Sequence, residues 1–230
     1  MIKRLFAVVS FVGLAGAAYV AGPFWRDVIT RPLVCENSDA RSDALLIDHV
    51  GGSYPLFERA RILQAREPMP PVLVPVLVQQ PPFEPAWLSF RITKLMCDAA
   101  ALSECITFAV PLAEPISLNV AQHTAHELQA RGIRSVSLVT DGFRSKRAAM
   151  VYARFLEPLG IVVHCQPVFG ALSQSSWHQS FHGTQNVVLQ LLKLAYYRVV
   201  VLPSHDAHRE SFASAPERRA PIFGDSPDSD

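Results

Sequence analysis

The stretch LVTDGFRSKRAAM, residues 138–150, begins as a buried strand and ends as a helix. Its first residues are apolar and β-branched, and its last ones are strong helix formers. A strand that leads directly into a helix is the repeating unit of a parallel α/β sheet. The junction carries an unusual set of polar residues for so short a turn: Thr140, Asp141, Gly142, Arg144, Lys146 and Arg147.

Apolar runs of strand length recur on both sides of this stretch and alternate with helical patterns. We expect strands at 44–49, 72–78, 105–110, 135–140 and 161–166. They predict a Rossmann-like, three-layer α/β domain with a mostly parallel sheet of about five strands and helices on both faces. Pro75 cannot donate to a ladder, so its strand is expected to be an edge, bulged or shorter than it looks.

Three helices are readable between and after these strands. Asn119 is placed as an N-cap with Gln122 closing a capping box, and Gly132 ends that helix. A second helix carries an apolar face after Arg147, made by Ala148, Val151, Tyr152, Phe155 and Leu159. The third covers 184–198, with an apolar face made by Val187, Val188, Leu191, Leu192 and Ala195.

The overall composition fits one α/β domain with terminal appendages. The chain has 230 residues, a formal charge of +1 and 18% charged residues. Nucleic-acid binding requires a concentrated excess of cations, so we expect no nucleic-acid partner. The motifs GxGxxG, GxSxG and HExxH and the Walker A sequence are all absent, and no cofactor can be named from the sequence.

The N-terminal residues predict a membrane anchor. Lys3 and Arg4 precede 21 uncharged residues, Leu5–Trp25, which as a helix would reach about 30 Å. The alternative is a cleaved signal peptide with Ala15-Gly16-Ala17 as its processing site. We expect an anchor at 1–25, a polar connector at 26–42, the α/β domain at 43–202 and a disordered tail at 203–230. The preceding cations orient the domain outside the cytoplasm.

The four cysteines indicate no metal site, because they lack CxxC pairing and histidines at ligand spacing. Cys105 and Cys165 lie in strand-like runs and are expected to be small buried residues. A Cys97–Cys105 disulfide requires an oxidising compartment, and the sequence leaves that pairing open.

Polar residues cluster where the carboxyl ends of the strands are expected, which is where open parallel sheets bind ligands. Helix starts and arginine forks there favour an anion. The alternative is that Asp141 caps its helix while the cations are solvated, and that Asp48 pairs structurally with Arg147 or Arg59. The candidate ligand-binding residues are Asp48, Ser117, Asn119, Thr140, Asp141, Arg144 and Arg147.

Three segments together resemble a known family. EPISLNVAQHTAHEL (114–128), SVSLVTDGFRSKRA (135–148) and 177–197 with its Gly183, Lys193 and Tyr196-Tyr197 are similar to the YdcF/SanA/ElyC-type bacterial envelope proteins. Val120 and Gln122 stand where that family has Thr and Glu, and Arg144 stands where it has His. A mechanism that uses this Glu or His as a proton carrier is therefore not expected here.

The resemblance implies a role in the bacterial cell envelope. Together with the anchor, it predicts a single-pass inner-membrane protein with a periplasmic α/β domain. This domain is expected to bind an anionic small molecule or a lipid-linked sugar phosphate, either with or without processing it. The alternative is a non-catalytic envelope scaffold whose ligand site has degenerated. The sequence assigns no reaction.

Overall fold

The computed structural model describes residues 22–48, 53–66, 69–78 and 86–204. Their core is one parallel five-stranded sheet in the order β3-β2-β1-β4-β5. The strands are β1 (Ala44–Ile47), β2 (Val72–Val78), β3 (Cys105–Pro111), β4 (Ser135–Asp141) and β5 (Val162–Val168). All five expected strands are confirmed, and the order is that of doubly wound nucleotide-binding sheets.

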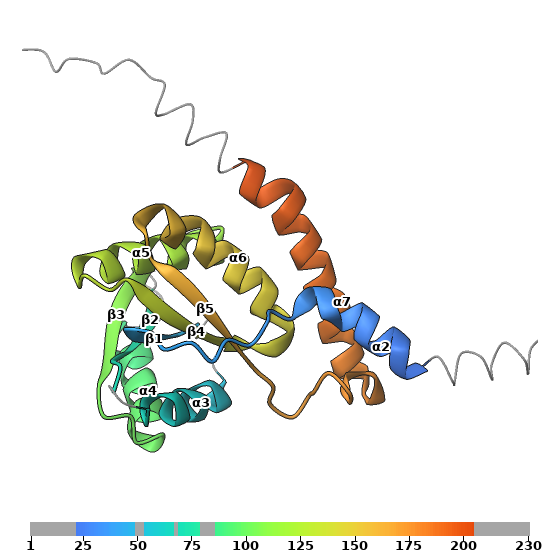
Figure 1. The fold of residues 1–230 in the computed structure, drawn as a ribbon, viewed down its shortest axis with the longest axis horizontal. Helices are drawn as coiled ribbons and strands as arrows, with labels where there is room; N and C mark the ends of the chain where they lie inside the picture. The colour runs from blue at the N-terminus through green and yellow to red at the C-terminus, as the bar shows by residue number, and fades with distance from the viewer. Residues whose placement is uncertain (1–21, 49–52, 67–68, 79–85, 205–230) are drawn as a thin grey trace, which may run out of the picture. The chain divides into compact units, whose positions relative to one another are not determined.

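Helices cover both faces of the sheet (Figure 1). α3 (Tyr54–Gln64) and α4 (Ala86–Ala99) lie on one face, and α5 (Ile116–Ala130) and α6 (Ser145–Leu156) lie on the other. The α/β layering expected from the sequence is therefore confirmed. The core on the α3 side is made by Leu45, Ile47, Leu56, Phe57, Ala60, Leu63, Val72, Val74, Cys97, Ala100 and Val139.

The expectation for Pro75 was wrong in part, because β2 is neither an edge strand nor shortened. It pairs with β3 along all of Val72–Val78, but with β1 only at Val72 and Leu73. The backbone N–H of Val72 donates to Glu104 O on the β3 side. Since N–H groups alternate between sides along a strand, the nitrogen of Pro75 points to the β1 side beyond the last β1 pair. No ladder bond is lost there.

The helix boundaries also differ from expectation. Pro115 is the N-cap residue of α5, so Asn119 lies inside the helix and its predicted capping box is absent from the structure. Gly132, with φ of +67°, ends the helix as expected. In α6 the residues Ala148, Val151 and Tyr152 are buried as expected, but Leu159 is exposed because α6 stops at Leu156.

The segment expected as an irregular connector is structured and packs on the domain. It forms α2 (Gly22–Thr30) and the 3-10 turn η1 (Arg31–Leu33), followed by an extended stretch. Leu33 is buried with Phe143, Trp177, Val187 and Leu194. The expected anchor lies almost wholly outside the described residues, and so does nearly all of the expected tail.

The last helix begins in the first of two compact units, which ends at Leu194, and continues into the second, which starts at Ala195. α7 (Phe181–Tyr196) is followed by a π-helical turn, η5 (Tyr197–Val201). Of its expected apolar face, Val187 is buried, but Val188 and Leu192 are exposed. Within the described ranges, Phe181–Ser204 is the one helix that could cross a membrane, judged by length and composition alone.

Candidate functional site

The carboxyl end of β1 and the carboxyl end of β4 meet at the centre of the sheet, where the strand order changes direction. In sheets of this order, that position is where ligands bind. Asp48 follows β1, while Thr140 and Asp141 end β4 and lead into the 3-10 turn η2 (Gly142–Arg144). We call the residues 140–147 together with Asp48 the corner.

Asp48 is buried and fully engaged at the corner. Its carboxylate accepts a hydrogen bond from Thr140 Oγ1 at 3.0 Å and forms an ion pair with Arg144. Arg144 also donates to the Asp48 carbonyl oxygen at 3.4 Å. The expectation of a structural pair is therefore confirmed, but the partner is neither Arg147 nor Arg59. Turn η2 places Arg144, and not Arg147, next to Asp48.

Two other ionisable side chains that interact with Asp48 have shifted pKa values, namely Asp141 of the corner and Tyr152 of α6. Burial raises the pKa of Asp141, and the positive charge of Arg144 opposes this shift. Burial, with the Asp48 carboxylate as a second cause, raises the pKa of the Tyr152 hydroxyl well above its ordinary value. The side chains of Thr124 and Asp48 lie next to this hydroxyl, but no described residue makes a hydrogen bond of standard geometry with it. Around Asp48, the corner therefore combines one ion pair with a carboxyl group whose pKa is raised, and it adjoins a phenol whose pKa is also raised.

Arg147 is buried, but its contacts lie away from Asp48. Its guanidinium donates to Ser117 Oγ at 3.3 Å and to Gln190 Oε1 at 3.4 Å, which joins α6 to α5 and α7. The solvated-cation alternative is wrong for Arg147 and Arg144, whereas Lys146 is exposed. Asn119 donates to the carbonyl oxygen of Pro111 instead of meeting Asp48.

The seven predicted site residues therefore lie in separate groups. Asp48, Thr140, Asp141 and Arg144 come together at the corner, while Ser117 contacts Arg147 and Asn119 contacts the end of β3. Their polar groups are directed at one another. The binding role expected for them stays a prediction.

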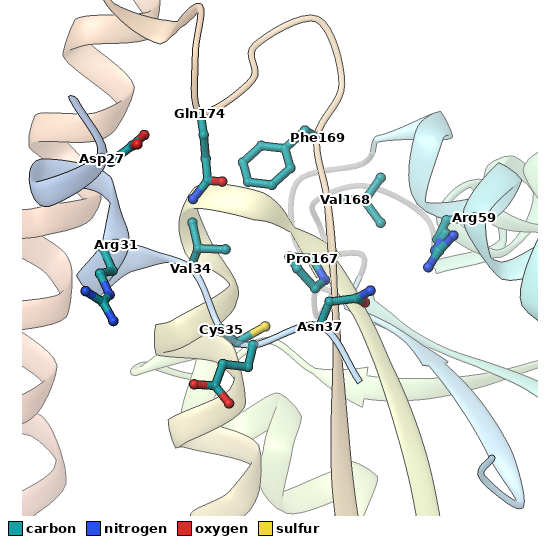
Figure 2. Close-up of a pocket in the computed structure, with 11 residues that line it drawn as sticks. Asp27, Arg31, Val34, Cys35, Asn37, Arg59, Pro167, Val168, Phe169 and Gln174 are labelled. Carbon is teal, nitrogen blue, oxygen red and sulfur yellow. The ribbon is translucent and has the colours of Figure 1, made fainter. Parts of the chain in front are cut away.

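A cleft of about 750 Å³ opens beside the end of β5. Figure 2 shows Asp27 and Arg31 on one side of it and Arg59 on the other. Sequence reasoning missed this cleft because its residues come from four separate segments, none of which has a recognisable motif. The lining residues are Asp27, Arg31, Val34, Cys35, Glu36, Asn37, Arg59, Pro167, Val168, Phe169 and Gln174.

Arg59 is the best-positioned cation of the cleft. It is half-buried, and its guanidinium donates to Gln166 Oε1 at 2.9 Å. Gln166 is 1% exposed and in turn donates to the carbonyl oxygen of Ser38. Within residues 22–48, 53–66, 69–78 and 86–204, neither Arg59 nor Arg31 pairs with a carboxylate. Arg59 is therefore oriented by a neutral acceptor, and no ion pair with a described residue compensates its charge.

The floor of the cleft is fixed by a disulfide that sequence reasoning did not foresee. Cys35 bonds Cys165, 130 positions later, and attaches the N-terminal segment to β5. The N–H of Ser38 donates to Cys165 O at 3.1 Å, and the N–H of Cys35 donates to Ser145 Oγ at 3.0 Å. Cys165 is buried as expected, but as a disulfide. The second pair, Cys97–Cys105, joins the two residues whose pairing the sequence left open.

The corner and the cleft share one aromatic contact. The ring of Phe169, which lines the cleft, packs edge-on against Phe143 of η2, with centroids 5.3 Å apart. A Cβ at Gly142 would lie 2.3 Å from the same ring. Glycine at 142 is therefore required for this close approach.

No family model and no curated protein matches the chain. The resemblance to YdcF/SanA/ElyC-type proteins has no support from these comparisons and stays a prediction. Function must be inferred from the chemistry of the corner and the cleft.

Proposed function

We propose that the chain is a membrane-anchored envelope protein whose α/β domain lies outside the cytoplasm and binds a small molecule with an anionic group. The binding site of this proposal is the cleft beside β5, in place of the corner expected from the sequence. The lipid-linked sugar phosphate that the sequence predicts as a ligand has such an anionic group. No reaction is included in the proposal, because no nucleophile with an adjacent base lines the described part of the cleft.

The observation that carries the proposal is the state of Arg59. A half-buried guanidinium that is oriented by Gln166, and that pairs with no carboxylate in the described part of the chain, is prepared to bind an anion. The charge costs desolvation energy in the empty protein, and a bound phosphate or carboxylate would recover part of it through charge-assisted hydrogen bonds. Arg31 offers a second cation from the opposite wall, and Phe169 offers an apolar surface.

The cysteines support the location. All four are paired, and the domain has no free thiol. Disulfides persist in oxidising compartments and are rare in the cytosol. This agrees with the orientation expected from Lys3 and Arg4.

A second candidate, a non-catalytic scaffold, is favoured by the corner. Arg144 and Arg147 both donate to groups of the protein itself. In a degenerate ligand site, the side chains that once bound the ligand would be bonded to other groups of the protein. The arginines at the corner have such internal partners.

The experiment is calorimetric titration of the full chain in detergent with inorganic phosphate and with glycerol 3-phosphate. Arg59→Ala should weaken binding by about 1.5–3 kcal/mol, the scale of a hydrogen bond to a charged group. Arg61→Ala is the matched control, because Arg61 is an exposed arginine of the same helix and does not line the cleft. Equal affinities for the two variants, or no binding by the wild-type chain, would favour the scaffold.

A further inference from the structure

Helix α2 presents an apolar face to solvent. Trp25, Val28 and Ile29 are 56%, 44% and 37% exposed. Their spacing of three and four residues puts them on one side of the helix. Trp25 is also the last residue of the uncharged run that the sequence predicts to span a bilayer. Aromatic residues are enriched at this boundary between hydrocarbon and headgroups.

One wall of the cleft begins directly after that boundary. Asp27 and Arg31 line the cleft and follow Trp25 by two and six positions. At a rise of about 1.5 Å per helical residue, they lie roughly 3–9 Å beyond the end of the uncharged run. The headgroup layer on each side of a bilayer is roughly 5–8 Å thick. Covalent connection alone therefore holds this wall at the depth of lipid headgroups when the run spans the membrane.

The charges of the cleft indicate the kind of headgroup. The lining contains two cations, Arg31 and Arg59, and two carboxylates, Asp27 and Glu36. This balance fits a zwitterion better than a simple anion. Arginine forks bind phosphate, and carboxylates accept hydrogen bonds from a primary ammonium group. A quaternary ammonium group has no N–H to donate.

We propose that the cleft binds the headgroup of a membrane phospholipid that carries a phosphate and a primary ammonium group, while Trp25, Val28 and Ile29 contact the bilayer. Arginines of the lining hold the phosphate, and carboxylates of the lining accept hydrogen bonds from the ammonium group. This inference rests on the proposed function, because it assigns a ligand to the same cleft. It adds that the ligand is presented by the membrane.

The test uses the full chain in lipid nanodiscs and follows the modification of individual arginines by phenylglyoxal with mass spectrometry. The discs contain phosphatidylcholine alone, or with phosphatidylethanolamine or phosphatidylglycerol added. Modification of Arg59 should slow several-fold only with phosphatidylethanolamine, while modification of Arg61 should not change. Val28→Ser with Ile29→Ser should reduce the protection. The matched pair Ile92→Ser with Leu95→Ser, which are exposed apolar residues of α4, should not.

Each alternative result has a definite meaning. Protection of Arg59 by soluble phosphoethanolamine, without protection by discs that contain the lipid, would overturn the membrane inference and leave the proposed function standing. Protection by phosphatidylglycerol alone would overturn the assignment of an ammonium group. A chain that does not insert into the discs would overturn the membrane inference, and absence of protection by every lipid and soluble headgroup would overturn both proposals.

Discussion

The corner and the cleft each contain two arginines, but these arginines differ in the partners that they have within the protein. At the corner, Arg144 pairs with the buried Asp48, and Arg147 donates to Ser117 and Gln190. In the cleft, the partner of Arg59 among the residues that the structure describes is the neutral Gln166, and Arg31 is exposed. A cluster of cations in a sequence therefore does not measure the capacity to bind an anion. The relevant quantity is the charge that remains uncompensated after folding.

The largest effect is expected from Arg144→Met. Removing this partner leaves Asp48 as a buried carboxylate without an opposite charge, and should lower the free energy of unfolding by about 3–5 kcal/mol. Urea denaturation at neutral pH measures it. Lys146→Met, at an exposed site of the same helix start, should change stability by less than about 0.5 kcal/mol. A stable Arg144→Met protein would mean that Arg144 is available to a ligand, and the contrast between corner and cleft would be lost.

Gly142→Ala tests whether the two regions are coupled. The added Cβ overlaps the Phe169 ring, so the ring must move, at a cost of about 1–3 kcal/mol in stability. Because Phe169 lines the cleft, phosphate affinity should fall as well. Gly170→Ala is the control, since a Cβ there would meet only Pro55 at an ordinary 3.8 Å. If Gly142→Ala destabilises the fold but leaves phosphate affinity unchanged, the regions act independently.

Tyr152→Phe should be neutral or stabilising, by up to about 1 kcal/mol. The hydroxyl is buried next to Thr124 and Asp48 but makes no hydrogen bond of standard geometry with a described residue, and removing a poorly satisfied polar group relieves its desolvation cost. Thermal unfolding of the two proteins under identical conditions measures the difference. A clear loss of stability would show that the hydroxyl is hydrogen-bonded in solution. The hydrogen-bond network around Asp48 would then include Tyr152.

The smallest effect is expected from Asp141→Asn, as a change in pH dependence. Burial raises the folded-state pKa of Asp141 above its ordinary value of 3.8. A raised pKa means that the folded state holds the proton more tightly, so the contribution of Asp141 to stability is present below pH 3.8 and is lost as pH rises through the folded-state pKa. Denaturation at several pH values should show that the free energy of unfolding of Asp141→Asn increases relative to that of the wild-type protein as pH rises from 3 towards neutrality. A difference that does not depend on pH would contradict the shifted pKa.

The sheet could be predicted because each strand is a short, mostly apolar run rich in β-branched residues, which is typical of parallel strands covered by helices. Boundaries at the helix starts were harder. Asn119 and Gln122 have the residue types of a capping box, but Pro115 is compatible with the first turn and lets α5 begin earlier. Local preference was overridden there by packing, since Leu118, Val120 and Ala121 are all buried.

The site was less predictable, because its chemistry depends on contacts between distant segments. The sequence identified Asp48 and the cations after β4, but spacing alone could not show that turn η2 brings Arg144 to Asp48. The cleft carries no local pattern at all. Recognising it requires knowing that Cys35 lies on β5 and that Arg59 reaches Gln166, two contacts that span more than a hundred positions.

The Cys35–Cys165 disulfide also determines where mechanical force enters the fold. A pull applied to the chain before Cys35 is transmitted through a covalent bond to β5, at the edge of the sheet. The extended stretch that follows Cys35 and the central strand β1 are relieved of that load. Hydrogen bonds of a ladder can unzip one at a time under tension, whereas the disulfide cannot. A domain tethered through its N-terminus would thus bear tension at its periphery, and the strand that joins the two halves of the sheet would remain unstressed.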